Sequence, residues 1–386
     1  MSTTTYRIAG IQNVLTPALA IYLDYVDHNI SATLRLLNGD ANRWRPHIKT
    51  AKLAAVIEPL VTRGITNMKC ATTRELIVAC EAGARDVLVA YPCVGTRAER
   101  VREIAAMFPK VAISVLVDDP AQVSTWADSQ VDVFLDVNPG MDRTGMEQDR
   151  TRDILALARA IRDQGTRFRG LHYYDGHLRE PDLTERTRIA HRGFDRLLQL
   201  VNELRQQGTP VEEVITSGTP AFPCALAYEA FQKGEFVHRI SPGTVVYNDL
   251  TSLAQLPADF DYFPAALVVS SVVSCPTRGI VTCDAGHKTV SADAGYPNCA
   301  VLGRPDLEPL HASEEHLPLH AASEHSLTIG KTLYLLPRHV CPTVNNFDHA
   351  LLISGGEIVD VAAVSARGRE APLRTPLYEK SRVGAT

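Results

Sequence analysis

Short runs of consecutive apolar residues recur through the first two thirds of the chain, with helical stretches between them. In Asp86–Tyr91 and Ala112–Val117 nearly every position is apolar, so each strand has to be buried on both faces. Strands of this kind belong to parallel sheets that helices cover. The alternation therefore predicts an α/β fold built on a parallel sheet.

The number of these units narrows the architecture. The predicted strands are Thr66–Cys70, Asp86–Tyr91, Val111–Val117, Val131–Val137, Arg169–Tyr174, Glu213–Thr216 and His238–Ser241, and the clearest helices are Thr73–Ala82, Thr96–Phe108, Asp149–Gln164 and Pro181–Gln207. With a short strand that ends at Lys49, they make eight strand–helix units between about residues 40 and 245. Eight such units close into a (β/α)8 barrel of the TIM type.

The pattern changes after Tyr247, where short β-rich pieces separated by glycine, proline and polar turns replace the long helices. We therefore predict an α/β barrel at residues 18–246, followed by an all-β domain at residues 247–386. The strand Ala18–Leu23 can pair with either part, so residues 1–23 can also join the β-domain. The histidine-rich stretch Arg304–Ser326 is predicted to be a loop.

Composition restricts the partners. The formal net charge is −5 and no basic run stands out, which argues against nucleic acid and anionic membranes. No apolar run reaches the roughly 18 residues of a membrane span, and the first residues lack the apolar core of a secretion signal. The eight cysteines show no CxxC pair, which predicts reduced thiols. We expect a cytoplasmic protein.

Lys49 lies in the segment Arg45–Thr50, a short strand that turns into a helix. A lysine at the carboxyl end of a barrel strand lies where barrel enzymes keep their chemistry, and partly buried lysines react with carbonyl groups. His47 precedes it by two residues and would point to the same face of the strand. From these residues alone, a solvated lysine and a packed histidine explain the segment equally well.

Two further patterns suit small ligands. The turns Ser217–Thr219 and Gly243–Thr244 each follow a predicted strand, and glycine lets backbone N–H groups approach a phosphate. Ordinary strand–helix turns have the same composition. His339 and Cys341 face one way if the chain is extended, and imidazole plus thiolate suits Zn²⁺ or another divalent ion. A buried cysteine beside a packed histidine is the alternative.

Six short sequence motifs, which occur in order and are spread over the whole chain, resemble those of the D-threonine aldolase / D-serine dehydratase-like family. These enzymes have the alanine racemase fold type and use pyridoxal phosphate. The resemblance implies a (β/α)8 barrel followed by a C-terminal all-β domain, with pyridoxal 5′-phosphate and a divalent metal (Zn, Mn or Mg) as cofactors. The motifs are Thr16–Ala18, Arg45–Thr50, Asp136–Gly145, Ser217–Pro220, Pro242–Thr244 and His339–Asn345.

The resemblance also implies roles for individual residues. Lys49 matches the lysine that binds the cofactor aldehyde, and Arg143 matches an arginine near the cofactor's phenolic oxygen. Ser241 departs from the alanine racemases, which place an arginine there to face the ring nitrogen; a neutral hydroxyl makes the ring a weaker electron sink. The other expected roles are cofactor contacts by His47 and Tyr174, phosphate contacts by Ser217, Gly218, Thr219, Gly243 and Thr244, acid–base catalysis by His177, metal binding by His339 and Cys341, and a turn at Asp293.

The first functional expectation is an aldolase that cleaves a D-3-hydroxy amino acid to glycine and an aldehyde. The alternative in the same class is a dehydratase, acting on D-serine or 3-hydroxy-D-aspartate, that releases a 2-keto acid and ammonia. A non-catalytic pyridoxal-phosphate carrier uses this barrel alone, and a cofactor-free interaction protein is a more distant candidate. The resemblance further implies a homodimer.

Overall fold

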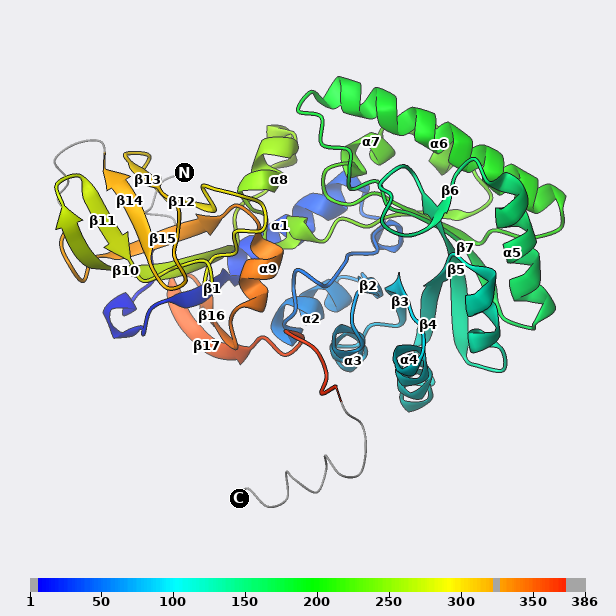
Figure 1. Cartoon of the computed structure of the whole chain (residues 1–386), viewed down its shortest axis with the longest axis horizontal. Coiled ribbons are helices and arrows are strands. Elements are labelled where there is room, and N and C mark those ends of the chain that lie inside the picture. Colours follow the sequence, from blue (N-terminus) through cyan, green and yellow to red (C-terminus); the bar gives the residue numbers. More distant parts are fainter. Residues whose placement is uncertain (1–5, 322–326, 373–386) are drawn as a thin grey trace, which may run out of the picture.

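The computed structural model of the chain describes residues 6–321 and 327–372. Figure 1 shows an α/β barrel on the right of the view and a strand-rich part on the left. The helices α1 (Leu23–Leu36) and α9 (Val340–Asn345) lie where these two parts meet. Because α9 lies in the predicted metal-binding motif His339–Asn345, we expect the parts of the site to meet at this junction.

Seven parallel strands form most of the barrel wall, in the order β2-β3-β4-β5-β7-β8-β9, and the two-residue β6 (Met146–Glu147) pairs with β5. Residues 44–48 close the wall: the N–H of Arg45 donates to Ile240 O at 2.9 Å, and the N–H of Ile48 donates to Lys69 O at 2.8 Å. The predicted barrel is thereby confirmed. The strands are β2 (Asn67–Cys70), β3 (Asp86–Pro92), β4 (Ala112–Val117), β5 (Val131–Asn138), β7 (Phe168–Tyr173), β8 (Glu213–Thr216) and β9 (Val237–Ile240).

Helices cover the outside of the barrel, and each buries an apolar stripe against the strands. The long helix α6 is an example. Its N-cap residue is Asp182, whose carboxylate accepts a hydrogen bond from the N–H of Glu185 at 2.8 Å. Phe194, Leu197 and Val201 then recur on its buried face at helical spacing. The helices are α2 (Ala54–Thr62), α3 (Thr73–Glu81), α4 (Thr96–Met107), α5 (Thr151–Asp163), α6 (Leu183–Gln206) and α7 (Phe222–Leu226).

The barrel interior is layered. At the amino ends of the strands lies a charged layer, in which Arg45 and Arg169 both donate to Asp86 and Glu213 at 2.7 to 3.0 Å. A separate apolar cluster of Leu88, Leu116, Phe134 and Ile215 lies inside the barrel. The carboxyl ends carry polar side chains again. Charged side chains can point into the barrel from these mostly apolar strands because the arginines and carboxylates of the charged layer neutralise one another.

The strand-rich part is a sheet in the order β13-β14-β11-β10-β1-β16-β17, with β15 paired to β10 and β12. Ala18–Leu23, which the sequence left unassigned, contains β1, and this strand lies between β10 and β16. The strands are β1 (Ala18–Tyr22), β10 (Ala266–Thr277), β11 (Ile280–Cys283), β12 (Cys299–Val301), β13 (Leu307–Pro309), β14 (Leu317–Ala321), β15 (Thr332–Pro337), β16 (His349–Ser354) and β17 (Glu357–Ala363).

The predicted loop at Arg304–Ser326 is wrong at two short segments, and the rest of its described residues lie outside helices and strands. It contains β13 and β14, which pair with each other, and β14 also pairs with β11. Leu317, Leu319 and Ala321 are buried while His320 faces out, so β14 is a half-buried strand whose proline and histidine conceal the alternation. Residues 322–326 lie outside the described part of the chain.

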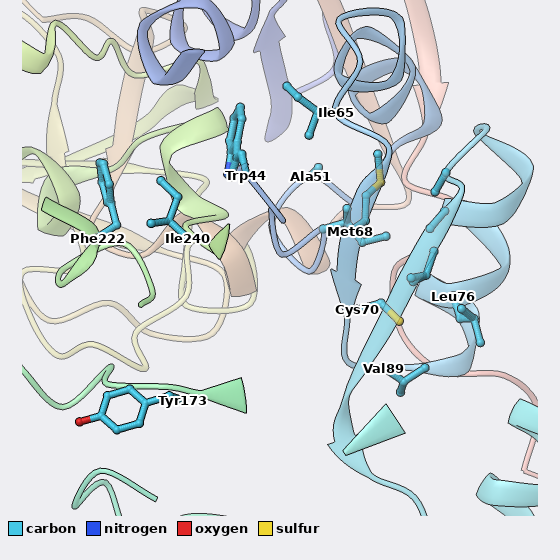
Figure 2. Close-up of a cluster of buried hydrophobic side chains, with 14 of the residues drawn as sticks. Trp44, Ala51, Ile65, Met68, Cys70, Leu76, Val89, Tyr173, Phe222 and Ile240 are labelled. Carbon is cyan, nitrogen blue, oxygen red and sulfur yellow. The ribbon is translucent and has the colours of Figure 1, made fainter. Parts of the chain in front are cut away.

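Trp44 anchors the segment that carries Lys49. Its side chain is fully buried, and its indole N–H donates to Pro242 O at 2.9 Å. Figure 2 shows it among other buried side chains, with Ile240 on one side and Met68 on the other. In the described residues no helix is both long and apolar enough to cross a membrane. The eight cysteines are free thiols.

Candidate functional site

A cavity of about 270 Å³ opens at the carboxyl ends of the barrel strands. Its wall combines the Lys49 segment, the loops that follow β7, β8 and β9, and residues of the strand-rich part. Thr50 and Cys341, which are 291 positions apart in sequence, approach to 3.0 Å here. The predicted site residues that line it are His47, Lys49, Tyr174, Gly218, Thr219, Gly243, Thr244, His339 and Cys341.

Lys49 and His47 both line this cavity, although Lys49 lies in a turn rather than on the strand that the sequence predicted. The backbone N–H of Lys49 donates to Nδ1 of His47 at 3.3 Å, so this ring nitrogen acts as an acceptor. Burial and the nearby ammonium groups of Lys49 and Lys69 hold the pKa of His47 well below its usual value. His47 is therefore a neutral imidazole beside the lysine amine.

Gly218 and Gly243 form a cradle in the cavity wall. A Cβ on Gly218 would lie 2.7 Å from Cε2 of Tyr174, and a Cβ on Gly243 would overlap the carbonyl oxygen of His47, so neither position has room for a side chain. Loop backbone that lines a cavity, next to the hydroxyls of Thr219 and Thr244, suits an anion.

Ser217 lies outside this cradle, unlike the other four predicted phosphate contacts. It is fully buried at φ 61°, and its hydroxyl donates to Asp175 Oδ2 at 3.0 Å. Burial raises the pKa of Asp175 to about 7, although the hydrogen bonds from Ser217 and from the N–H of Gly218 lower it. Ser217 and Asp175 thus brace the loop from behind, which sequence reasoning did not detect because Asp175 belongs to another strand's loop.

Tyr174 is surrounded by cations. Cζ of Arg143 lies 4.9 Å from its ring centroid, and the Nζ atoms of Lys69 and Lys49 lie at 5.7 Å and 5.9 Å. Arg143 lines a small hollow next to the main cavity, with Tyr174 as the residue common to both. His177 lines neither: it is half-buried, and burial lowers its pKa. Arg179, two residues on, lines the main cavity instead.

His339 and Cys341 come together, though not on the extended chain we predicted. His339 precedes the first turn of α9 and Cys341 lies in that turn. Nδ1 of His339 hydrogen-bonds Asp293 Oδ2 at 2.7 Å, so Asp293 is more than the turn residue that the sequence predicted. Burial lowers the pKa of His339, but the Cys341 sulfur and the Asp293 carboxylate outweigh it and raise this pKa to about 9. Burial raises the pKa of Cys341, and His339 and Lys49 reverse that and lower it below its usual value.

A buried chain of polar groups lies below the cavity and was missed in the sequence. Lys69 Nζ contacts Nε2 of His172 at 2.9 Å and donates to Oγ of Ser241 at 2.8 Å. Nδ1 of His172 in turn bonds Asp136 Oδ1 at 2.7 Å. No local signal could have revealed it, because each residue comes from a different strand. Ser241 also lines the cavity, so the chain reaches the site.

Fold and cavity together define a (β/α)-barrel protein whose small-molecule site lies at the barrel mouth and is completed by a β-sheet part. The chain belongs to the alanine racemase family: residues 21–250 match the alanine racemase N-terminal domain, and residues 265–353 match the putative serine dehydratase domain. The family implies pyridoxal phosphate as the cofactor.

Several relatives are similar over nearly the whole chain. A D-threonine aldolase of Arthrobacter sp. is 27% identical over 372 residues, 93% of this chain and 94% of that protein. A D-threo-3-hydroxyaspartate dehydratase of Delftia sp. (strain HT23) is 25% identical over 359 residues, 86% and 92% of the two chains. The structure of a D-threonine aldolase from Filomicrobium marinum superposes with a TM-score of 0.84 at 28% identity. The superposition covers 94% of this chain and 97% of that one. These relatives are lyases, some aldolases and some dehydratases.

Proposed function

We propose that the protein is a pyridoxal-phosphate- and divalent-metal-dependent lyase that acts on D-3-hydroxy amino acids, with aldol cleavage to glycine and an aldehyde as the first candidate reaction. One observation carries the proposal: a lysine amine, an anion cradle and a histidine–cysteine pair line a single cavity, although they come from distant parts of the chain.

The residues present fit pyridoxal phosphate. Lys49 would hold its aldehyde, the backbones of Gly218 and Gly243 with the hydroxyls of Thr219 and Thr244 would hold its phosphate, and Arg143 would face its phenolic oxygen. The fit rests on the chemistry of the lining, because a lysine, two glycine backbones and two threonine hydroxyls line the same cavity. When bound, the cofactor supplies an electron sink for the substrate's amino-acid carbons.

The metal proposal rests on the donor set of His339 and Cys341. Because Asp293 accepts the proton of Nδ1, Nε2 of His339 is left as a ligand atom, the arrangement common in metal-binding histidines. Two ligands leave positions for water and substrate, although no group of three or more His, Cys, Asp or Glu is preassembled in the described chain. A bound divalent cation would polarise the substrate's hydroxyl.

The relatives support this pair. Two similar structures are variants of a D-threo-3-hydroxyaspartate dehydratase: one replaces a histidine by alanine, and the other, in a metal-free form, replaces by alanine a cysteine numbered two positions later. These are the residue types and the spacing of His339 and Cys341. The proposal transfers metal binding to this chain on that likeness and on the contact between the two side chains.

This chain's own groups suit the remaining tasks. The Nζ atom of Lys49 is the proposed base, because Lys49 lines the cavity and its charge acts on Cys341 of the proposed metal pair. Arg179 lines the cavity and forms no ion pair with any described carboxylate, so its guanidinium is available for a substrate carboxylate. The neutral His47 would hold a hydrogen bond without adding charge.

Dehydration is the second candidate, and one observation favours it: the histidine–cysteine spacing matches the variants of a dehydratase. The two reactions start from the same complex and differ in the bond that breaks. In aldol cleavage the base removes the proton of the 3-hydroxyl and the Cα–Cβ bond breaks. In dehydration the base removes the α-proton and the hydroxyl leaves.

The test incubates the purified protein, supplied with pyridoxal phosphate and Mn²⁺ or Zn²⁺, with D-threonine, D-serine and threo-3-hydroxy-D-aspartate. Aldehyde and glycine identify the aldolase, whereas keto acid and ammonia identify the dehydratase. Lys49→Ala is expected to abolish both and to remove the visible cofactor absorbance. L-threonine serves as the stereochemical control. If the wild type releases none of these products, the proposal fails, and a coloured but metal-free and inactive protein would indicate a carrier.

A further inference from the structure

Lys69 is a buried lysine that forms no ion pair with a carboxylate of residues 6–321 or 327–372. Only 2% of its surface is exposed, and its Nζ atom contacts two neutral groups, Nε2 of His172 and Oγ of Ser241. Because Asp136 accepts the proton of Nδ1, Nε2 of His172 accepts from Lys69. Burying an ammonium group against neutral acceptors is costly, so this position calls for an explanation beyond packing.

The surrounding charges do not neutralise Lys69 fully. Asp136 is the nearby anion and reaches it through His172, while several cations act against it. Burial, followed by the repulsion of these cations, lowers the pKa of Lys69 to about 7. The groups that face it are Lys49, His47 and Arg45 on the closing segment, Asp136 on β5, Arg143 on the loop after β5, His172 on β7, and Tyr174 and Asp175 on the loop after β7.

Ser241 connects this lysine to the cavity. Its Oγ atom accepts from Lys69, and the residue lines the cavity wall beside Gly243. The hydroxyl proton of Ser241 is only weakly hydrogen-bonded, because its backbone acceptors, Thr216 O and Ser217 O, lie 3.3 Å and 3.2 Å from Oγ. A ligand atom in the cavity can therefore compete for this proton.

We propose that Lys69 is a positioning residue that orients the Ser241 hydroxyl toward the ring nitrogen of a bound pyridine-type cofactor. This inference rests on the proposed function. The resemblance to the alanine racemases implies that position 241 faces the ring nitrogen, and among the described cavity hydroxyls Ser241 is the one that accepts a hydrogen bond from a buried lysine.

The Lys69–Ser241 pair has two states, which differ by one proton on Lys69. When Lys69 is an ammonium, it donates to Ser241 Oγ, and the hydroxyl proton points into the cavity as a donor. When Lys69 loses a proton to solvent, it still donates to His172, and its lone pair accepts the hydroxyl proton of Ser241. The hydroxyl oxygen then faces the cavity as an acceptor. No other bond changes.

The experiment follows the spectrum of bound cofactor rather than turnover. Holoprotein is treated with borohydride, which reduces the linkage to Lys49 to a secondary amine and so fixes pyridoxal phosphate in place, and its absorption and fluorescence are recorded against pH. The variants are Lys69→Met, Lys69→Arg and Ser241→Ala. Lys52→Met is the matched control, because Lys52 is also buried but pairs directly with Glu75 at 2.8 Å.

The wild type is expected to show one spectral step near neutral pH. Lys69→Met and Ser241→Ala should remove this step or move its midpoint by at least about one pH unit. Lys69→Arg should hold the low-pH spectrum throughout, because arginine keeps its charge. Lys52→Met should lower the unfolding temperature and leave the midpoint unchanged.

Three results overturn the inference: a wild type without a step, an unchanged midpoint in Lys69→Met and Ser241→Ala, or identical effects of methionine and arginine at position 69, which would indicate a packing role. If Lys69→Met does not fold, the arginine and Ser241→Ala variants decide. A protein that binds no pyridoxal phosphate refutes the proposed function as well, whereas a coloured protein without the step refutes the Lys69 inference alone.

Discussion

Replacing Gly243 by alanine tests whether the cradle and the Lys49 segment are mechanically coupled. The added Cβ would lie 3.1 Å from the carbonyl carbon of His47 and closer still to its oxygen, whereas ordinary contacts begin near 3.4 Å. Since the obstacle is backbone, the segment itself has to move, by about 1 Å for contact with the oxygen. That movement would carry Lys49 away from the cradle.

The expected cost of this overpacking is about 1–3 kcal/mol of unfolding free energy. A displacement of about 1 Å at reacting groups lowers turnover by about 100-fold. Urea unfolding gives the first quantity, and pyridoxal-phosphate titration together with lyase assays gives the second. We expect both to change, with cofactor binding weakened in proportion to the loss of fit.

Gly193→Ala is the matched control. Its Cβ would overlap the hydroxyl of Tyr173, on the outer side of the barrel wall where α6 packs. It should destabilise the fold by less, because the far end of a side chain moves more easily than backbone, and it should leave cofactor binding intact. The reasoning is refuted if Gly243→Ala retains wild-type stability and affinity, or if Gly193→Ala weakens the cofactor as much.

The remaining predictions concern charge. Glu213→Gln should cost about 3–5 kcal/mol of unfolding free energy, because it leaves buried arginines unpaired, whereas Glu212→Gln on the exposed neighbour should cost less than about 1 kcal/mol; urea unfolding that ranks the two equally would contradict the charged layer. The pKa of Asp175 is raised to about 7 from 3.8, so the folded protein binds more protons than the unfolded chain between these values and loses stability as pH rises through them. Asp175→Asn should abolish this dependence, and equal slopes of stability against pH in both proteins would count against it. Arg179→Gln should raise KM by about 10-fold or more if its guanidinium binds a substrate carboxylate, by loss of a charged hydrogen bond of about 1.5–3 kcal/mol; an unchanged KM would exclude that role. Asp293→Asn should lower the bound metal content at least about tenfold, measured by metal analysis after dialysis, because it removes the carboxylate that orients His339, and full occupancy would contradict the ligand assignment.

Local pattern was sufficient for the barrel. Strands such as Asp86–Tyr91 are short apolar runs between amphipathic helices, and both signals depend on neighbours in sequence. The position of Lys49 at the cavity could be inferred for the same reason, because the end of a strand in a barrel is also its functional end. The pairing of β1 could not, since a strand's partner depends on long-range contacts.

Tertiary structure decided how polar groups are shared. Asp293 reaches His339 across 46 positions, Ser217 turns its hydroxyl to Asp175 instead of the cavity, and Lys69 finds His172 and Ser241 on other strands. The physical reason is the same each time. A buried polar atom takes whichever partner the closed barrel brings within about 3 Å, and that distance is independent of separation along the chain.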